Sequence, residues 1–481
     1  MALLNSSLGA SAGKRRSLDL VEVSLSDVTY SSSSRVNTYT PSSQFFGRNT
    51  SQPAATILRD VTTTIAPYRV SAWMGPSGSG KTTLLSVAAG LEDRLDGGSI
   101  KVNGEDGCLP KNRLGIVWQE DLLLSNLTVR ETINFSARLK SPKSFTDAEI
   151  DNLVDDIISK LGLIHVQHSL IGGGSSKVRG ISGGERKRTA VAVELVSQPS
   201  VLLLDEPTSG LDSNSAFQLM LTLKELAKLG HAIAVIIHQP RTEIFHMVDH
   251  LLLLSKGQVL YDGDPHSVRK YLEERPSVGK LPAETNIADW IMDTIILDEN
   301  SKDGSQLPLM WKDHVQNVRI SVLESGTMRS SGGKASMTET PELMCRTLST
   351  LKELEKEPKY ARGFWTQLKL LYVRSARQQR GQRLTRVALI LTFSWTLFTS
   401  LCWGYIPDTT SYTHSRSSLI FFLLIAQSNA VVTSSLVIFT SERHLLSRER
   451  AKKLYSVLPY FMAMTASDMM NHLRCYLLLD M

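Results

Sequence analysis

The chain has 481 residues, of which 42% are hydrophobic, and its formal net charge at pH 7 is +6. This length predicts two or three domains with a real core. The four cysteines are far apart and lack metal-ligand spacing, which argues against a cysteine metal site and indicates reduced thiols. The basic residues cluster beside apolar segments near the C-terminus, so a membrane surface explains them better than nucleic acid does.

The first part of the chain is polar. Residues 1–17 are expected to be disordered, and no apolar run follows their basic residues, so we expect no secretory signal. Residues 18–30 alternate well enough for an early strand. Residues 31–56 are rich in Ser, Thr, Asn and Gln, and we expect them to form a flexible insertion.

A glycine-rich stretch, Gly75 to Thr82, fits the phosphate-loop pattern G-x-x-x-x-G-K-[ST]. Residues 69–74 before it predict a short buried strand, and residues 83–89 after it predict a helix. Glycines let the backbone wrap closely around a polyphosphate, and the helix N-terminus then faces the anion. Lys81 can reach the β- and γ-phosphates, and the Thr82 hydroxyl can ligate Mg²⁺.

A second strand, residues 114–118, ends at Gln119. A glutamine opposite a phosphate loop can ligate Mg²⁺ or position a water molecule, although a solvated glutamine is the default interpretation of such a residue alone. Residues 128–140 and 147–161 follow with helical periodicity.

Ser182, Gly183 and Gly184 precede a predicted helix that runs through residues 190–196. Consecutive N–H groups and a serine hydroxyl at a helix start form an anion site. The simpler alternative is an ordinary serine N-cap.

Four apolar residues, 201–204, are followed by Asp205 and Glu206. An Asp at the end of a buried strand beside a phosphate loop holds Mg²⁺, and the next Glu can polarise a water for attack on the γ-phosphate. Residues 232–237 predict a further buried strand that ends at His238. This histidine could contact the γ-phosphate, although a lone histidine is more often structural.

The last part of the chain predicts a membrane region. Residues 301–360 are mostly polar and are expected to be a linker, and residues 361–386 predict a basic amphipathic helix on the inner membrane surface. Residues 387–407 and 417–441 are each long and apolar enough to span a bilayer. A third apolar run begins near Leu454, is interrupted by Asp468 and is incomplete at Met481. Arginine and lysine flank the two spans on one side, so both ends are expected to be cytosolic.

These motifs, in this order, resemble the nucleotide-binding domain of an ABC transporter. The stretches around Ser182, Asp205 and His238, read as RGISGGERKR, DEPTSGLDS and HQP, resemble the G subfamily of White-type half-transporters. The resemblance is dense from about Leu18 to Asp293. It implies an α/β P-loop NTPase (ABC ATPase) domain over residues 18–300, followed by an all-α transmembrane domain over residues 387–481 that is incomplete.

The resemblance also implies roles for single residues. Lys81, Gln119, Glu206 and His238 would be catalytic, and Thr82, Gln119 and Asp205 would ligate Mg²⁺. ATP would be bound by Gly75, Pro76, Ser77, Gly78, Ser79, Gly80, Lys81, Thr82, Thr83, Ser182, Gly183, Gly184, Glu185 and Asp212. The signature, Ser182 to Glu185, would cap ATP held by the opposite subunit, and it ends in Glu185 where many other subfamilies have Gln. Tyr30 is the candidate for stacking on adenine.

The implied function is that of a half-transporter subunit that binds and hydrolyses ATP and drives export of a lipid-like or other hydrophobic substrate. Its expected partners are a second half-transporter, as a homo- or heterodimer, and membrane lipid, with no nucleic acid. We expect a multi-pass membrane protein with a cytosolic nucleotide domain, by default in the plasma membrane. The alternative is a truncated, non-transporting subunit that regulates full-length relatives, because two spans cannot readily enclose a pathway.

Overall fold

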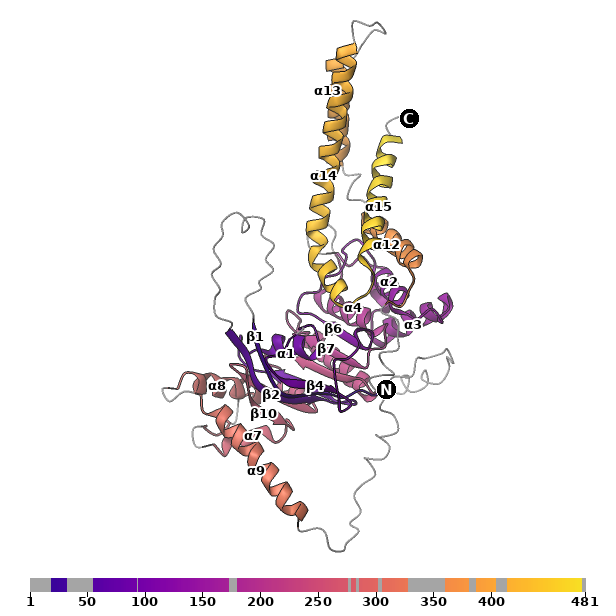
Figure 1. The fold of residues 1–481 in the computed structure, drawn as a ribbon. Helices are drawn as coiled ribbons and strands as arrows, with labels where there is room; N and C mark the ends of the chain where they lie inside the picture. Colours follow the sequence, from indigo (N-terminus) through magenta and orange to yellow (C-terminus); the bar gives the residue numbers. More distant parts are fainter. Residues whose placement is uncertain are drawn as a thin grey trace. The chain divides into compact units, whose positions relative to one another are not determined.

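A computed structural model describes residues 19–32, 55–92, 94–172, 180–275, 278–282, 285–301, 305–327, 360–379, 386–403 and 413–477. These residues fall into two compact units, drawn in Figure 1. The first unit takes in residues 1–121, 155–163 and 182–358, and the second takes in residues 122–154, 164–181 and 359–481. The expectations for residues 1–17 and for most of the insertion 31–56 lie outside the described residues.

The first unit contains two sheets. The four-stranded antiparallel sheet has the order β2-β1-β4-β5, with β1 Val23–Ser32, β2 Ala55–Ile65, β4 Gly97–Val102 and β5 Glu105–Asp106. The six-stranded sheet has the order β10-β9-β3-β8-β7-β6, with β3 Val70–Met74, β6 Leu114–Val117, β7 Val201–Asp205, β8 Ala232–Ile236, β9 His250–Ser255 and β10 Gln258–Gly263. Its strands are parallel except β10, which pairs antiparallel with β9.

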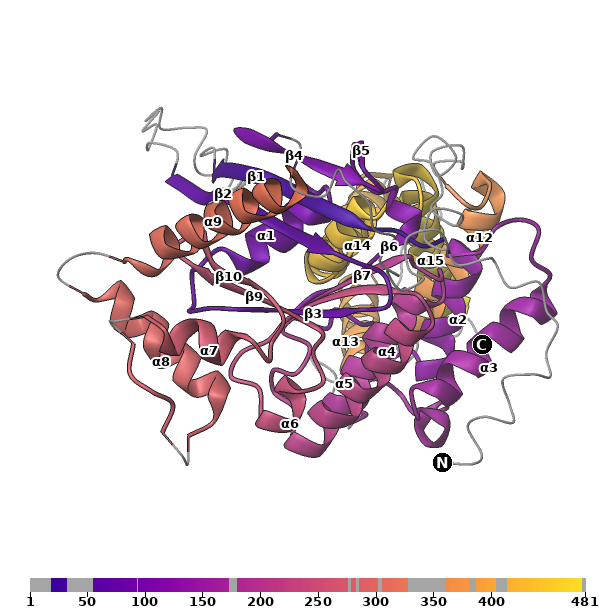
Figure 2. The ribbon, with the colours of Figure 1, turned by 90° about the horizontal axis from the view of Figure 1, so that it is seen from below.

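Helices cover both faces of the six-stranded sheet. Figure 2 shows α1, Lys81–Ala88, between the two sheets, and α4, Gly183–Leu195, with α5, Ser213–Lys228, on the opposite face. Every residue of β3, β7 and β8 is buried, as expected of parallel strands covered on both faces. One apolar core joins α1 to both sheets, with Trp73 its largest fully buried side chain.

The first unit also contains several further helices. They are η1 Lys111–Arg113, α6 Thr242–Phe245, α7 Val268–Glu273, α8 Ile287–Glu299 and α9 Leu307–Thr327. Helix α9 lies in the range expected to be a linker. Its Trp311 ring lies 5.3 Å from the ring of Tyr261 and 5.4 Å from that of Tyr271, measured between centroids. The first part of the expected linker therefore packs on β10 and α7.

The second unit is helical. It contains α2 Val129–Lys140, η2 Ile164–Val166, α12 Phe364–Gln378, α13 Arg386–Trp403, α14 Thr413–Ala451 and α15 Val457–Leu477, while α3, Asp147–Lys160, has residues in both units. The expected order, an α/β domain followed by an all-α part, is confirmed.

Helices α2 and α12 lie antiparallel along each other. At one end, Arg362 Nε donates to the carbonyl oxygen of Arg138 at 3.1 Å, and at the other the Asn126 side chain donates to the carbonyl of Gln378 at 2.7 Å. Between them Arg377 forms an ion pair with Glu131 at 2.9 Å. These contacts fix both ends of α12 on α2.

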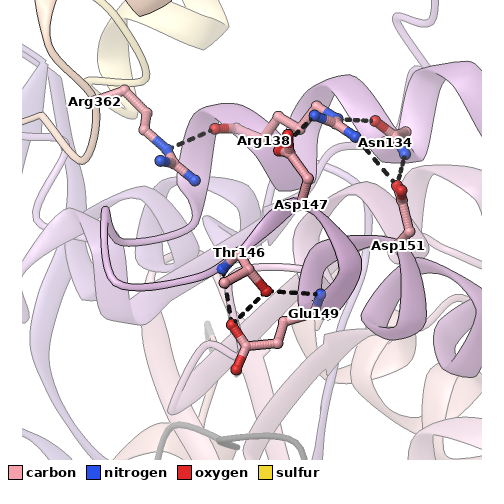
Figure 3. Close-up of polar contacts among 7 residues, drawn as sticks. All are labelled: Asn134, Arg138, Thr146, Asp147, Glu149, Asp151 and Arg362. Atoms are coloured by element: carbon pink, nitrogen blue, oxygen red, sulfur yellow. Dashed lines mark hydrogen bonds and ion pairs between the residues drawn. The ribbon is translucent and has the colours of Figure 1, made fainter.

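Figure 3 shows how the C-terminal end of α2 is held. The Arg138 guanidinium donates to Asn134 Oδ1 at 2.6 Å and pairs with Asp147 at 2.7 Å, while its carbonyl accepts from Arg362. Asn134 in turn donates to Asp151 at 2.8 Å. Thus α3 and the start of α12 are both tied to one residue of α2.

A buried charge cluster joins α12 to the end of α14. Arg374 contacts both carboxylate oxygens of Glu449, at 2.7 and 3.1 Å, and Tyr455 donates to the same carboxylate. The rings of Tyr455 and Tyr460 stack at 5.6 Å between centroids, and both belong to an apolar cluster with Leu371. The bidentate geometry suits a pair removed from water.

In the described part of the chain, no helix combines the length and the apolar composition that a membrane crossing requires. The expected spans 387–407 and 417–441 fall largely in α13 and α14, and they stay predictions.

The buried His231 gives a prediction for the pH dependence of stability. Burial lowers the pKa of His231 below its usual 6.5, against a hydrogen bond between its Nδ1 and the carbonyl of Pro199 at 2.7 Å. The folded protein keeps this ring neutral while the unfolded chain protonates it, so stability is lost as the pH falls below 6.5 toward the lowered pKa.

We expect His231→Gln to remove part of this dependence, at most about 1.4 kcal/mol per pH unit. Urea unfolding between pH 5 and 8 measures it. The exposed His266→Gln should leave the slope as in the wild type, and an unchanged slope in His231→Gln would refute the assignment.

The Arg374 cluster gives a second prediction. Arg374→Met leaves the Glu449 carboxylate buried without its partner, so we expect a loss of about 3–5 kcal/mol in the stability of the second unit. Replacing both residues, as in Arg374→Met with Glu449→Leu, should recover most of this loss. Thermal unfolding in detergent micelles measures the change, with the exposed Lys369→Met on the same helix as the control. A single variant as stable as the control would show that the pair contributes nothing.

Candidate functional site

The phosphate loop closes around its own lysine. Lys81 Nζ donates to the carbonyls of Gly75 and Pro76 at 2.8 and 2.7 Å and to Ser79 Oγ at 3.3 Å. Burial lowers the pKa of Lys81, and the charges of Glu206 and Asp205 oppose that shift. The loop therefore presents a buried cation whose present partners are neutral oxygens, and a phosphate could replace them.

Glycine is required at two positions of the loop. A Cβ on Gly75 would lie 2.1 Å from the carbonyl oxygen of Leu254, closer than any real contact. Gly80, at the N-cap of α1, has a φ of 96°, in the left-handed region that favours glycine. The backbone thus begins α1 directly after the loop, with the helix N-terminus available to an anion.

Thr82 and Asp205 bring two oxygens together that could ligate a metal ion. The Thr82 hydroxyl donates to Asp205 Oδ1 at 3.3 Å, across from the first turn of α1 to the end of β7. Burial raises the pKa of Asp205, a hydrogen bond from Thr82 and the charges of Lys81 and Lys187 lower it, and the charge of Glu206 raises it further. A divalent cation at these oxygens would offset the desolvation of the carboxylate, so this pair fits Mg²⁺, a hard cation that takes carboxylate and hydroxyl oxygens.

Glu206 is held on both sides. Gln119 Nε2 donates to Glu206 Oε2 at 2.8 Å, and His238 Nε2 lies 3.0 Å from Glu206 Oε1. Strand register explains the meeting, because Val117 pairs with Leu204 and Asp205 pairs with Ile236, so the three side chains follow neighbouring parallel strands at one edge. In open α/β sheets ligands bind outside this edge.

The backbone is strained where these side chains meet. Glu206 has a φ of 46° and Gln239, which follows His238, has a φ of 42°. Non-glycine residues are uncommon in this region, and such strain clusters at functional sites. The turns after β7 and β8 thus aim Glu206 and His238 at one point.

The signature forms a capping box. Ser182 Oγ accepts from the N–H of Glu185 at 3.3 Å, and the Glu185 carboxylate accepts from the N–H of Ser182 at 2.8 Å. Glutamine can form the same box, which gives a physical reason why this position takes either Glu or Gln. Gly184 is tight as well, because a Cβ there would lie 3.0 Å from Ser215 on α5.

Asp212 and Tyr30 are two further residues that the sequence analysis assigned to the nucleotide site. The Asp212 carboxylate caps α5 by accepting from the N–H of Ser215 at 3.1 Å. Hydrogen bonds from the Ser215 side chain and then from its N–H lower the pKa of Asp212. Tyr30 donates its hydroxyl to Glu92 at 2.8 Å and packs against the core of the first unit. A role for Tyr30 in stacking on adenine stays a prediction.

The structure adds one residue that the sequence did not single out. Lys187, in α4, is buried and contacts the chain at Gln119. Its sequence setting, between Arg186 and Arg188, gives no signal, because three consecutive basic residues on a helix are usually a solvated face.

Comparisons with known proteins agree with these motifs. A family model described as ABC transporter matches residues 58–209, and one described as ABC-2 type transporter matches residues 366–479. ABC transporter G family member 14 of Arabidopsis thaliana is 34% identical over 419 residues, which cover 86% of this chain and 63% of that protein. G family member 21 of the same plant is 32% identical over 467 residues, covering 95% and 67%. G family member 22 of Dictyostelium discoideum is 35% identical over 422 residues, covering 85% and 64%. The chain thus spans between 63% and 67% of the length of these three curated relatives.

The capping box can be tested by two variants of one residue. We expect Glu185→Gln to leave the stability of the nucleotide-free protein within about 0.5 kcal/mol of the wild type, because the amide can still accept from Ser182. Glu185→Ala should lose about 0.5–1.5 kcal/mol, because it removes the hydrogen bond that the carboxylate accepts from the Ser182 N–H, while Ser182 still caps the helix. Chemical unfolding of the full chain measures both. Equal losses in the two variants would show that the charge matters and the cap does not.

Proposed function

The chain belongs to the G family of ABC transporters, and from this premise we propose that it is a half-transporter subunit that binds ATP and hydrolyses it to drive transport across a membrane. The observation that carries the proposal is the position of Glu206. It lies between Gln119 and His238, directly after the buried Asp205 that bonds Thr82 of the phosphate loop. This arrangement supports the proposal, because Glu206 could act as a base, with two hydrogen-bonding partners, beside the loop that would bind phosphate.

The proposed chemistry assigns a task to each group. Lys81 would exchange the carbonyls of its loop for the β- and γ-phosphates of ATP. Glu206 would accept a proton from the attacking water, and His238 and Gln119 would orient Glu206 and the γ-phosphate. Mg²⁺, held by Thr82 and Asp205, would neutralise charge on the phosphates when bound. Attack in line with the leaving oxygen then needs only positioning and charge stabilisation from the protein.

A second subunit would complete the site. The sequence carries one phosphate loop and one signature. The family resemblance places ATP between the loop of one subunit and the signature of the other, so two chains would be required. In this arrangement the N-terminus of α4, which the capping box at Ser182 orders, would face the partner's phosphates. The partner would be an identical chain or another half-transporter.

The second unit would carry the membrane function. Large apolar side chains are exposed on α13 and α14, among them Phe393, Leu401, Phe421, Leu424 and Val432. Soluble surfaces rarely expose such a set, so we assign it to lipid and to helices of the partner. The ABC-2 type match over residues 366–479 supports this assignment. We propose a hydrophobic or lipid-like substrate and, by default, the plasma membrane.

Coupling would use the α2–α12 contacts. The ends of α12 are fixed on α2, and the centre of α12 is fixed on Glu449 after the second expected span. The resemblance assigns residues 442–450 to the cytosolic loop that transmits closure of the nucleotide domains. We propose that Arg374 and Arg377 on α12 connect this loop to α2.

The assignment of Glu206 gives a direct test. We expect Glu206→Gln to bind ATP as the wild type does and to lower ATP turnover by about 10²- to 10⁴-fold, because the amide cannot accept the proton of the attacking water. Steady-state phosphate release and ATP binding, both measured on the full chain in lipid nanodiscs, separate the two effects. The matched control is Glu225→Gln on the exposed face of α5, which should hydrolyse ATP normally. Unchanged turnover in Glu206→Gln would remove Glu206 from the mechanism.

A further inference from the structure

Lys187 is a buried lysine on the signature helix. Only 2% of its surface is exposed, and its Nζ lies 2.8 Å from the carbonyl oxygen of Gln119, 3.3 Å from that of Trp118 and 2.8 Å from Asp121 Oδ1. Two hydrogen bonds to backbone carbonyls and one ion pair thus join the amine to three residues of one short segment, 118–121.

Burying an ammonium group is costly unless it is paired and hydrogen-bonded, and an apolar side chain would fill the same space at no such cost. A cation at this position therefore needs a reason other than packing. The two backbone carbonyls provide that reason, because the Lys187 amine donates to both of them and so fixes the path of the backbone at Gln119. Asp121, which balances the charge, has 13% of its side chain exposed and is the last residue of this stretch in the first unit.

The helix that carries Lys187 begins at the signature. Five residues separate Ser182 from Lys187, or about 7.5 Å along a helix axis. Residues on one helix move together, so a displacement of the Ser182–Glu185 turn also displaces the Lys187 amine. The amine holds the Gln119 carbonyl, and the Gln119 side chain holds Glu206 at 2.8 Å.

We propose that Lys187 is a positioning residue that couples the signature helix to the contact between Gln119 and Glu206, so that engagement of the signature by one nucleotide sets the geometry of the other nucleotide site. The inference rests on the proposed function, in which a chain's signature meets the ATP held by its partner. One side chain then connects the signature, which would contact the ATP bound by the partner, with the ATP site of its own chain.

The test is a double-mutant cycle on the full chain in lipid nanodiscs. Lys187→Met keeps the length of the side chain and removes the charge and donors. We expect it to lower kcat for ATP about tenfold or more, the effect of losing charge-assisted hydrogen bonds, and to leave ATP binding within about threefold. Lys187→Arg, which keeps the charge and the donors, should recover part of kcat. The exposed Lys228→Met on α5 is the control and should match the wild type.

Gln119→Ala decides between positioning and general structure. If Lys187 acts through Gln119, Lys187→Met should have little further effect on kcat once Gln119 is Ala. A Lys187 that merely stabilises the fold would lower kcat by the same factor in both backgrounds, and that result overturns the proposal. The cooperativity between the two ATP sites should also be lower in Lys187→Met than in the wild type, and an unchanged Hill coefficient above 1 would equally overturn the proposal.

Asp121→Asn is the second variant, for the case that Lys187→Met does not fold. It keeps the amine and both carbonyl contacts and removes only the balancing charge. We expect a smaller loss of kcat that Gln119→Ala again cancels, and an additive loss overturns the proposal.

The proposed function and the role of Lys187 can be refuted separately. If Glu206→Gln leaves ATP turnover unchanged, the proposed function is refuted. If turnover needs Glu206 but the losses of kcat in the Lys187 and Gln119 variants simply add, only the role of Lys187 is refuted.

Discussion

A carboxylate buried at the end of β7 is the constraint on which the nucleotide-binding unit depends. Asp205 has 4% of its surface exposed, and burial pushes its pKa up, toward the neutral acid. A buried acid remains ionised only if donors and cations surround it. Thr82 and Lys81 come from the phosphate loop and α1, and Lys187 comes from the signature helix. Two separate segments, the loop with the start of α1 and the signature helix, must therefore converge on one side chain.

Much of this site could be predicted from the sequence, because its chemistry is local. Gly75 to Thr82 form the loop through their own backbone, and the apolar runs that end at Asp205 and His238 are strands of a parallel sheet, whose carboxyl ends share an edge. The meeting of Gln119, Glu206 and His238 follows from register alone. Lys187 could not be predicted, because which residue of a basic triplet faces inward depends on packing against a segment 68 residues away.

The limits of the fold prediction have similar causes. The polar composition of residues 301–360 indicates a linker, yet Trp311 of α9 packs against two tyrosines of the folded unit, and Lys312 pairs with Asp60. Apolar composition marks residues 417–441 as a span but does not say where a helix ends, and α14 continues through charged residues to Ala451. In both cases a few tertiary contacts, such as those of Glu449, decide what local composition leaves open.

The same rule of paired buried charge applies in both units. In the first unit Lys187 fixes the backbone at Gln119 and pairs with Asp121. Residues 122–128 then lead directly into α2, whose two ends hold α12. Helix α12 carries Arg374, which is paired with Glu449. One path of covalent bonds and ionic contacts therefore runs from the Gln119–Glu206 contact to α14, the helix that contains the second expected span. Such contacts have directional geometry, which apolar packing lacks, so they can transmit a small displacement without losing register.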